Sequence, residues 1–338
     1  MLFINTGTLG DVVISSLILE YDDRITGYEK IYFLVKEEFS GILDNYKGRV
    51  NIIKWKRKEY KLNIFARLKF LRYLHSLNLK TTYNLTSARG ITCDELALLS
   101  GAGEKYCLNK NYLYLKKYFG QKTDRLYDEV LYDDVLNEYE KYINLIKILT
   151  GNKDVYVLKN HSKTYPGDAE VPEIREGKYV VVSPFAGDIK RSYGVNNFRT
   201  ICTKLSDKFK IVILGTEREK EISEGITGGI KNVINLTGKL HLKDLPAVIK
   251  NAEFYIGNDS GLTHIALRMN TPLVAIIGGG NYGRYLPYME SAQRKYLFHQ
   301  MECFGCQWKC IYKERHCITD LEIETVIDTI NKLEYENS

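Results

Sequence analysis

The alternation of short apolar runs with helix-length segments is the feature that most limits how this chain can fold. Ten such runs recur along its 338 residues. Short buried strands separated by helices predict parallel sheets with helices on both faces. A chain of this length exceeds one ordinary domain, so two doubly wound α/β domains are expected. The predicted strands are Leu2–Asn5, Ile31–Val35, Asn51–Trp55, Thr81–Thr86, Glu129–Tyr132, Tyr179–Ser183, Lys210–Leu214, Val233–Leu236, Phe254–Ile256 and Leu273–Ile277.

A Pro-Gly interruption at Lys163–Asp168 predicts the linker between the two domains, because proline is otherwise scarce in the chain. The domains are then residues 1–165 and 166–338. Ligands of doubly wound sheets bind beyond the carboxyl ends of the strands. Two such domains facing each other across a cleft would share one site. Residues 319–322 have the form of a capping box ahead of a C-terminal helix.

The segment Tyr255–His264 is the most distinctive local pattern. A strand-like run leads through Gly-Asn-Asp-Ser-Gly into an apolar helical stretch, which predicts a strand, a tight turn and a helix N-terminus. Such a turn directs backbone N–H groups at one spot and favours an anion or a polyhydroxy ligand. A plain capped helix start accounts for the pattern equally well. The side chains expected around the spot are those of Asp259, Ser260, Thr263 and His264.

Asp11 is the one carboxylate in the Gly-rich segment Asn5–Val13 that follows the first strand. The segment lacks the G-x-G-x-x-G pattern of dinucleotide sites and the lysine of a P-loop. Asp11 could stabilise the first turn of a helix. It could also act as a general base, although a helix N-terminus keeps a carboxylate ionised at the expense of its basicity.

Two further loops follow predicted strands. Lys190 and Arg191 lie in the loop after the strand Tyr179–Ser183, where adjacent cations suit a diphosphate, although surface Lys-Arg pairs are common. Glu217 begins a helix after the strand Lys210–Leu214. It could accept hydrogen bonds from ribose hydroxyls or simply favour the helix N-terminus.

Four of the seven cysteines fall within fifteen residues, in the pattern C-x2-C-x3-C-x6-C. This density predicts a tetrahedral thiolate site for zinc or iron, with disulfides or free thiols as the alternatives. A four-thiolate site leaves no open ligand position, so it would stabilise a loop rather than catalyse a reaction. The site lies some forty residues beyond the Tyr255–His264 segment. Its ligands would be Cys303, Cys306, Cys310 and Cys317.

Positive charge is concentrated in the first half of the chain. Residues 1–165 carry 26 Lys and Arg against 20 Asp and Glu, whereas the remainder carries 22 of each. Residues 47–80 contain eleven basic residues and one acid, Glu59. The run is either a solvated helix face or a surface that attracts an anionic membrane or a phosphorylated substrate.

These pieces, in this order, resemble glycosyltransferase family 9, the bacterial heptosyltransferase family. The resemblance extends from Met1 to about Leu333. It depends most on Thr8–Val13 and on Gly257–His264, together with Lys190-Arg191, Val233–Lys239, Arg284–Tyr288 and the cysteines. It implies a GT-B fold and an inverting, metal-independent transfer from a nucleotide-diphospho-sugar, typically ADP-heptose.

The resemblance also implies roles for single residues. Asp11 matches the base that deprotonates the acceptor hydroxyl, and Lys190 matches the lysine that holds the donor phosphates. Asp259, with its neighbours Ser260, Gly261 and His264, matches the loop that binds diphosphate and sugar. Leu240 falls where the family packs adenine, and Glu217 lies near the ribose contact. Some members bind iron through cysteines at the position of Cys303–Cys317.

The chain departs from the family pattern around the sugar and the acceptor. Ile14 and Leu17 stand where His and Pro are usual, and Ser183-Pro184-Phe185 replaces His-Pro-Gly. Ser192-Tyr193 follows Lys190-Arg191 in place of Trp-Pro, and the usual Gly-Pro turn is Gly278–Asn281. The identities of donor sugar and acceptor are therefore less constrained than the reaction.

The resulting expectation is a cytoplasmic glycosyltransferase without a catalytic cofactor, which builds a surface glycan such as lipopolysaccharide core. Its partners would be a nucleotide-sugar donor and an anionic glycan or glycolipid acceptor, with peripheral contact to the inner membrane. The alternatives are a heptosyltransferase acting on a protein or another glycan, a nucleotide-sugar epimerase of the same fold, and a nucleic-acid-binding protein with a zinc-ribbon-like element. The predicted first strand begins at Leu2, so no signal peptide is expected.

Overall fold

The computed structural model describes residues 1–25, 27–109, 117–132, 137–155, 171–174 and 177–337. The chain divides into two compact units, Met1–Val157 and Leu158–Ser338. The predicted linker Lys163–Asp168 and the boundary between residues 165 and 166 lie outside the described residues. In the described part of the chain, no helix has the length and apolar character that crossing a membrane requires.

Unit 1 is built on a six-stranded sheet in which every strand pair is parallel. The strand order is β3-β2-β1-β4-β5-β6, so the order reverses between β1 and β4. Phe3 of β1 pairs with Phe33 on one side and with Tyr83 on the other. The strands are β1 (Leu2–Asn5), β2 (Tyr32–Lys36), β3 (Asn51–Trp55), β4 (Thr81–Asn84), β5 (Glu104–Asn109) and β6 (Glu129–Tyr132).

Helices of unit 1 enclose the sheet because its strands carry apolar side chains on both faces. One face packs Leu2, Ile4 and Leu34 against buried residues of α3 and α4. Other helices include α1, η1 and α6, which contact one another. The helices are α1 (Leu9–Ser15), η1 (Ser16–Arg24), η2 (Glu37–Tyr46), α2 (Arg57–Leu62), α3 (Ile64–Ser76), α4 (Ile91–Leu98), α5 (Lys117–Asp124) and α6 (Glu138–Thr150).

Unit 2 repeats the same architecture with the order β12-β11-β10-β7-β8-β9, again all parallel. Read from its own first strand, this is the arrangement of unit 1, and the order reverses between β7 and β10. The strands are β7 (Tyr179–Ser183), β8 (Lys210–Ile213), β9 (Val233–Asn235), β10 (Tyr255–Asn258), β11 (Leu273–Ile276) and β12 (Arg294–Leu297).

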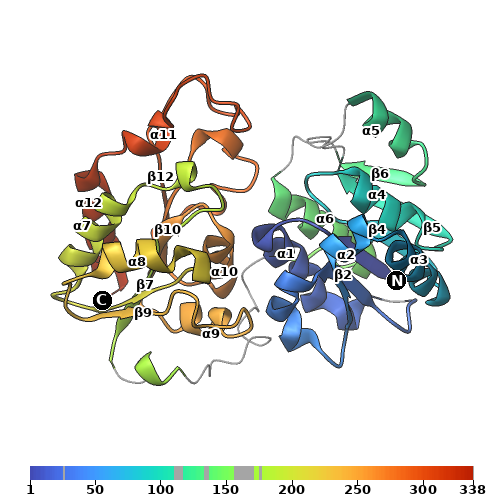
Figure 1. The fold of residues 1–338 in the computed structure, drawn as a ribbon, viewed down its shortest axis with the longest axis horizontal. Coiled ribbons are helices and arrows are strands. Elements are labelled where there is room, and N and C mark those ends of the chain that lie inside the picture. Colours follow the sequence, from blue (N-terminus) through green and yellow to red (C-terminus); the bar gives the residue numbers. More distant parts are fainter. Residues whose placement is uncertain (26, 110–116, 133–136, 156–170, 175–176, 338) are drawn as a thin grey trace. The chain divides into compact units, whose positions relative to one another are not determined.

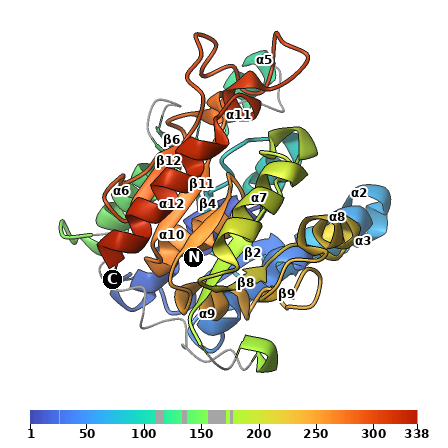
Figure 2. The same ribbon diagram turned by 90° about the vertical axis from the view of Figure 1, so that its left-hand side faces the viewer.

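Helices α7 and α12 supply apolar residues to one face of the second sheet, including Phe198, Val326 and Ile330. Helix α10 contacts β10, β11 and α9. Figure 2 shows the long C-terminal α12 in front of the sheet. The helices are η4 (Pro172–Ile174), η5 (Ile189–Arg191), α7 (Val195–Leu205), η6 (Glu217–Glu219), α8 (Lys220–Thr227), α9 (Leu245–Lys250), α10 (Gly261–Met269), η7 (Gly279–Asn281), α11 (His316–Thr319) and α12 (Ile323–Asn337).

The predicted fold class, α/β with two doubly wound parallel sheets, is confirmed (Figure 1). All ten predicted strands are present, with ends shifted by up to two residues. Two strands, β5 and β12, were missed. The doubly wound topology places the candidate sites where each strand order reverses, since ligands of such sheets bind beyond the carboxyl ends of these strands.

Candidate functional site

Asp11 lies in the first turn of α1, directly beyond the carboxyl end of β1, and only 8% of it is exposed. Its Oδ2 accepts hydrogen bonds from the backbone N–H of Thr8 (2.7 Å) and from the Thr8 hydroxyl (2.8 Å). Thr8 is the N-cap of α1. Asp11 therefore has the helix-capping role that the sequence allowed, and this role fixes the orientation of its carboxylate.

The Ser87 hydroxyl donates a hydrogen bond to Oδ1 of Asp11, a contact that the sequence did not reveal. Ser87 lies in the loop after β4, which pairs with β1 at the point of strand-order reversal. In the same loop, the Thr86 hydroxyl accepts a hydrogen bond from the backbone N–H of Thr6 (3.1 Å). Polar groups from two neighbouring strand ends thus converge on one carboxylate.

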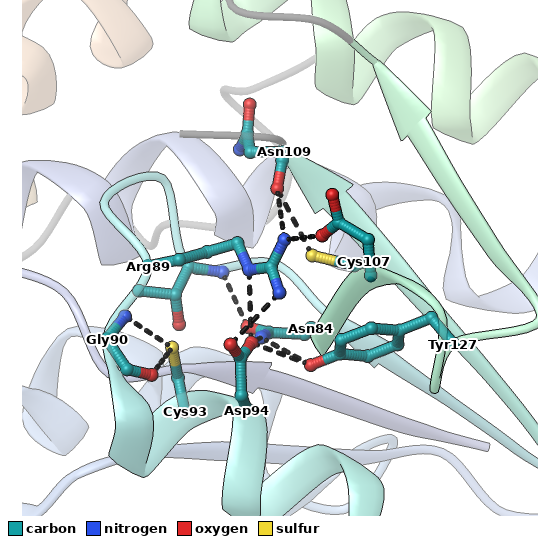
Figure 3. Close-up of polar contacts among 10 residues, drawn as sticks. Asn84, Arg89, Gly90, Cys93, Asp94, Cys107, Asn109 and Tyr127 are labelled. Atoms are coloured by element: carbon teal, nitrogen blue, oxygen red, sulfur yellow. Dashed lines mark hydrogen bonds and ion pairs between the residues drawn. The ribbon is translucent and has the colours of Figure 1, made fainter. Parts of the chain in front are cut away.

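A buried ion pair holds the loop between β4 and α4 in place (Figure 3). The Arg89 guanidinium is fully buried and binds both carboxylate oxygens of Asp94, at 3.0 and 2.9 Å. The third guanidinium nitrogen of Arg89, Nη1, donates to Asp124 at 2.5 Å, and the Tyr127 hydroxyl donates to Asp94 (2.9 Å). Removing one partner of such a pair would leave a buried charge uncompensated. The network therefore supports the loop that carries Ser87 rather than serving as a ligand site itself.

Lys36, the last residue of β2, adds a cation to the surroundings of Asp11. Burial lowers the pKa of Lys36, and repulsion from Arg57 and Lys61 lowers it further. Attraction to Glu38 and Asp11 offsets part of this fall. Asp11 thus lies within electrostatic reach of Lys36, which in turn feels the cations of α2.

In unit 2, Asn258 joins the two loops at the point of strand-order reversal. Its side-chain amide donates to the carbonyl of Pro184 (2.6 Å), and its Oδ1 accepts from the backbone N–H of Tyr193 (3.0 Å). Asn258 ends β10, whereas Pro184 and Tyr193 belong to the loop that follows β7. The structure therefore brings together the two segments that the sequence had assigned to anion binding.

Asp259, Arg191 and His264 form a charged group at this junction. Burial raises the pKa of Asp259, and His264 and Arg191 partly offset that rise. His264 Nε2 lies 3.8 Å from Asp259 Oδ1. The neighbouring Lys190 is exposed. The backbone N–H of Lys190 donates to the Asp188 side chain (3.0 Å), and this bond fixes the turn. The direction of the Lys190 ammonium group then depends on the conformation of the loop. Two cations and a histidine near a helix N-terminus can hold a diphosphate.

The remaining residues of this motif shape the turn. Ser260 is the N-cap of α10 and Gly261 is its first residue, so their backbone N–H groups belong to the helix end. Thr263 is fully buried. Its hydroxyl donates to the Asn258 carbonyl (2.5 Å) and lies 3.0 Å from the Tyr255 hydroxyl. Thr263 therefore stabilises the turn from inside instead of facing its outer surface.

Glu217 and the segment after β9 lie side by side. The backbone N–H of Gly238 donates to the Gly215 carbonyl (3.0 Å). Gly238 has a positive φ of 75°, and a Cβ there would lie 2.1 Å from Oε2 of Glu217. A side chain at position 238 would therefore displace Glu217. Leu240 follows in the same loop and is half-buried, so the two residues predicted to contact ribose and adenine belong to adjacent loops.

The segment of residues 303–317, which holds the four clustered cysteines and is called the cysteine loop below, packs directly on Gly278–Gly280. The backbone N–H groups of Gly305 and Gln307 donate to the carbonyls of Gly279 and Gly280, both at 2.8 Å. A Cβ on Gly280 would fall 2.4 Å from the Trp308 ring. Only glycine allows so close an approach of the ring.

Trp308 also connects this loop to the charged group. The guanidinium carbon of Arg191 lies 4.4 Å from the centroid of the Trp308 ring, a cation–π distance. Arg315 lies over the same ring at 5.9 Å and donates to Asp188 at 3.3 Å. The cysteine loop therefore borders Arg191 despite the sequence separation, a relation that the sequence did not reveal.

The four clustered cysteines lie on this loop as free thiols, with Cys317 buried and the other three half-buried. Burial raises the pKa of Cys317, and the thiols of Cys303, Cys306 and Cys310 raise it further, so all four are electrostatic neighbours. Within the described ranges, however, no three His, Cys, Asp or Glu side chains are arranged to hold a metal ion. The predicted iron or zinc site is therefore not confirmed.

The known sequences that resemble this chain are described as heptosyltransferases. The sequence profile of glycosyltransferase family 9 (heptosyltransferase) matches residues 150–313. Lipopolysaccharide heptosyltransferase 1 of Campylobacter coli is 22% identical over 289 residues, which cover 81% of this chain and 82% of that protein. Lipooligosaccharide heptosyltransferase 2 of Campylobacter jejuni is 30% identical over 169 residues, covering 47% of this chain and 53% of the relative.

Solved structures share the fold at low sequence identity. The family 9 glycosyltransferase of Veillonella parvula superposes with a TM-score of 0.77 at 16% identity, covering 99% of this chain and 97% of its own. Escherichia coli heptosyltransferase WaaC with ADP gives 0.71 at 16% identity, covering 100% and 99%. The iron-containing dodecameric glycosyltransferase TibC of E. coli gives 0.58 at 14% identity, covering 100% and 77%. The expected GT-B fold is thereby confirmed.

Proposed function

The chain belongs to glycosyltransferase family 9 and is a glycosyltransferase, and from this premise we propose that it transfers a heptose from ADP-heptose to a lipopolysaccharide core acceptor with inversion. The observation that carries the proposal is the position of Asp11. This carboxylate is oriented by Thr8 and Ser87 beyond the strands at which the sheet order of unit 1 reverses. Such points are where doubly wound sheets bind their ligands.

In the proposed reaction, Asp11 takes the proton of the acceptor hydroxyl as its oxygen attacks the anomeric carbon of the donor. The bond from that carbon to the diphosphate breaks, and ADP leaves with the bonding electron pair. Attack from the face opposite the leaving group inverts the anomeric configuration. No metal ion takes part in these steps.

The proposed donor site is the junction of β7 and β10 in unit 2. Lys190 and Arg191 would neutralise the diphosphate, and the α10 N-terminus with Asp259, Ser260, Gly261 and His264 would hold diphosphate and sugar. Fixed donors of this kind stabilise a departing anion without reorganising in the transition state. Glu217 would accept from the ribose hydroxyls, and Leu240 would pack against adenine.

We assign the four clustered cysteines a structural metal, iron or zinc. Four thiolates are a donor set suited to either metal, and all four thiols are electrostatic neighbours on one loop. The fold relative TibC is described as iron-containing. The ion would stabilise the loop that carries Trp308, since a four-thiolate site offers no position for substrate.

The enzyme is further proposed to act in the cytoplasm on an anionic acceptor. The net positive charge of the chain falls in residues 1–165, the part that carries Asp11. The direct test is product analysis with ADP-heptose and a heptose-free lipopolysaccharide core acceptor. Appearance of a heptosylated product of inverted configuration is the expected result. Consumption of ADP-heptose without an added acceptor, or no use of it in the presence of several core acceptors, would contradict the assignment.

A further inference from the structure

Helices α2 and α3 form a short hairpin that is fixed by its inner face. Asn63 alone joins them, and its side-chain oxygen accepts from the backbone N–H groups of Phe65 (3.0 Å) and Ala66 (3.1 Å). The Tyr60 ring packs edge-on against Trp55 and Phe70, with centroids 5.7 and 5.9 Å away. The hairpin is therefore a preformed surface feature of unit 1.

The outer side of the hairpin exposes large apolar side chains around the connecting turn. Leu62 is 86% exposed, Phe65 79% and Ile64 56%. Leu68 and Tyr73 follow on α3 at 44% and 45%. Single exposed apolar residues are common, but a cluster of this kind marks an interaction surface. The later part of α3 packs on the core, through Leu74 and the partly buried Phe70 and Leu71.

The same two helices also carry exposed cations. Five exposed basic residues occupy the two helices, and in the described part of the chain none of them has an ion-pair partner within 4 Å. Arg67 is different, because it binds Glu95 at 2.6 Å. The one acid of the two helices is Glu59. The five residues are Arg57, Lys58, Lys61, Lys69 and Arg72.

The hairpin borders the Asp11 region of the same unit. Arg57 and Lys61 both repel the Lys36 ammonium, and Asp11 attracts it. Lys36 is therefore an electrostatic neighbour both of the α2 cations and of the proposed catalytic carboxylate. A ligand surface on the hairpin would be next to the position where the acceptor hydroxyl must be held.

We propose that the α2–α3 hairpin docks on the surface of an anionic phospholipid bilayer. Leu62, Ile64 and Phe65 would enter the boundary between headgroups and acyl chains, while the cations of the two helices bind lipid phosphates. Apolar side chains combined with Lys and Arg are the composition of interfacial helices. A nucleic acid or a free glycan would match the charge but would leave the apolar turn in water. The consequence that docking presents a lipid-anchored acceptor to Asp11 depends on the proposed function, whereas docking itself does not.

The test is flotation of the whole protein with vesicles that contain no glycolipid. We expect binding to vesicles of phosphatidylglycerol and phosphatidylethanolamine, and little binding to phosphatidylcholine vesicles. Leu62→Ser combined with Phe65→Ser should lower partitioning at least tenfold, because both side chains lose their apolar burial. Lys58→Gln combined with Lys61→Gln should lower it about 25-fold, and should also reduce its salt dependence.

Matched controls are Ile148→Ser, which removes a 63% exposed apolar side chain from α6, and Lys204→Gln combined with Lys231→Gln in unit 2. Neither should change partitioning, and all variants should melt like the wild type because the altered side chains are exposed. Equal losses in the controls, or no binding of the wild type to anionic vesicles, would refute the proposal. So would a loss of self-association, detected by sedimentation velocity, with unchanged vesicle binding in the Leu62/Phe65 variant.

The same variants separate docking from catalysis. ADP affinity, measured by calorimetry, should be unchanged in the Leu62/Phe65 variant, because the proposed donor site lies in unit 2. Vesicle binding by a protein that transfers no heptose would leave docking intact and refute the proposed function. Heptose transfer by a protein that does not bind anionic vesicles would refute docking and leave the proposed function intact.

Discussion

The Asp11 carboxylate receives hydrogen bonds from two sources that act on different oxygens. The capping bonds from Thr8 both fall on Oδ2, whereas Oδ1 accepts from the Ser87 hydroxyl. Capping fixes the direction of the carboxylate, and a fixed direction is what a general base requires. Helix capping and proton transfer are therefore compatible at this residue, although the sequence presented them as alternatives.

The Asp11→Asn variant tests the base. An asparagine side chain keeps an oxygen that can accept from Thr8, so the fold and ADP binding should persist while transfer falls about 10²–10⁴-fold. Initial rates with ADP-heptose and acceptor, together with thermal unfolding, give both readouts. Wild-type turnover would show that Asp11 is only a helix cap, and so would an unfolded variant.

Lys190 and Arg191 should differ in their contributions to donor binding. Lys190→Ala removes an exposed ammonium group and should weaken ADP binding about tenfold or more, the effect of a lost charge-assisted hydrogen bond. Arg191→Ala should lower ADP affinity by at least the same factor, because Arg191 also stacks on Trp308 and lies near Asp259. Calorimetric titration with ADP is the measurement. Unchanged affinity in the Lys190 variant, with a loss in the Arg191 variant, would assign the phosphate contact to Arg191 alone.

At the scale of single residues, the sequence predicts site residues that belong to a local motif. It misses those that come to the site from a distant part of the chain. Asp11 lies in the first turn of the helix that follows β1, and Asp259 lies between β10 and α10, so their positions follow from local pattern. Ser87 meets Asp11 across 76 residues, and Trp308 meets Arg191 across a still longer stretch of sequence. Such contacts depend on strand order, which no local pattern determines.

At the scale of elements, strands were missed where their apolar content is low. β5 has the sequence Glu-Lys-Tyr-Cys-Leu-Asn, and β12 is Arg-Lys-Tyr-Leu. Among the strands that the structure describes, β12 lies at the edge of its sheet, so one side of it has no paired strand there and polar residues are tolerated. The strands that were predicted lie mostly inside the sheets, where burial on both faces makes them continuously apolar.

The cysteine loop is an element whose place could not be inferred from sequence distance. Its separation in sequence from the Tyr255–His264 segment suggested a structural loop remote from that segment, yet its Trp308 stacks on Arg191. We expect Trp308→Ala to weaken ADP binding two- to fivefold, the effect of losing an exposed to half-buried cation–π contact. Trp308→Phe should restore part of the affinity, because an aromatic face remains. Equal ADP affinity in all three proteins would show that the stack does not position Arg191.

The proposed metal gives the same loop a second test. Protein purified under reducing conditions without added metal should contain about one iron or zinc ion per chain. Cys306→Ser should lower both the metal content and the thermal stability, since metal-binding energy contributes to folding. Elemental analysis and thermal unfolding are the measurements. Native protein that contains neither metal, and in which all four thiols react freely with an alkylating reagent, would exclude the site.

At the scale of the whole molecule, the uneven distribution of charge follows the proposed division of function between acceptor binding in unit 1 and donor binding in unit 2. The excess of basic residues falls in residues 1–165, whereas the remainder is balanced. Several of the cations of residues 47–80 are engaged within unit 1, among them Arg49 with Asp22 and Arg67 with Glu95. Those around α2 remain exposed to solvent. Net charge of this kind changes encounter rates and affinity for anionic partners rather than the fold.

Reversing Lys56, Arg57 and Lys58 to Glu should therefore separate acceptor binding from donor binding. The KM of an anionic acceptor should rise steeply and its salt dependence should flatten, because each cation near an anionic surface contributes about 1 kcal/mol within a Debye length of about 8 Å. The donor KM should be unchanged, since the donor is assigned to unit 2. Steady-state kinetics at two ionic strengths are the measurement, with Lys204→Glu combined with Lys231→Glu as the control that alters unit 2 instead. Equal changes in both KM values would indicate misfolding, and no change in either would show that the basic run is an ordinary solvated face.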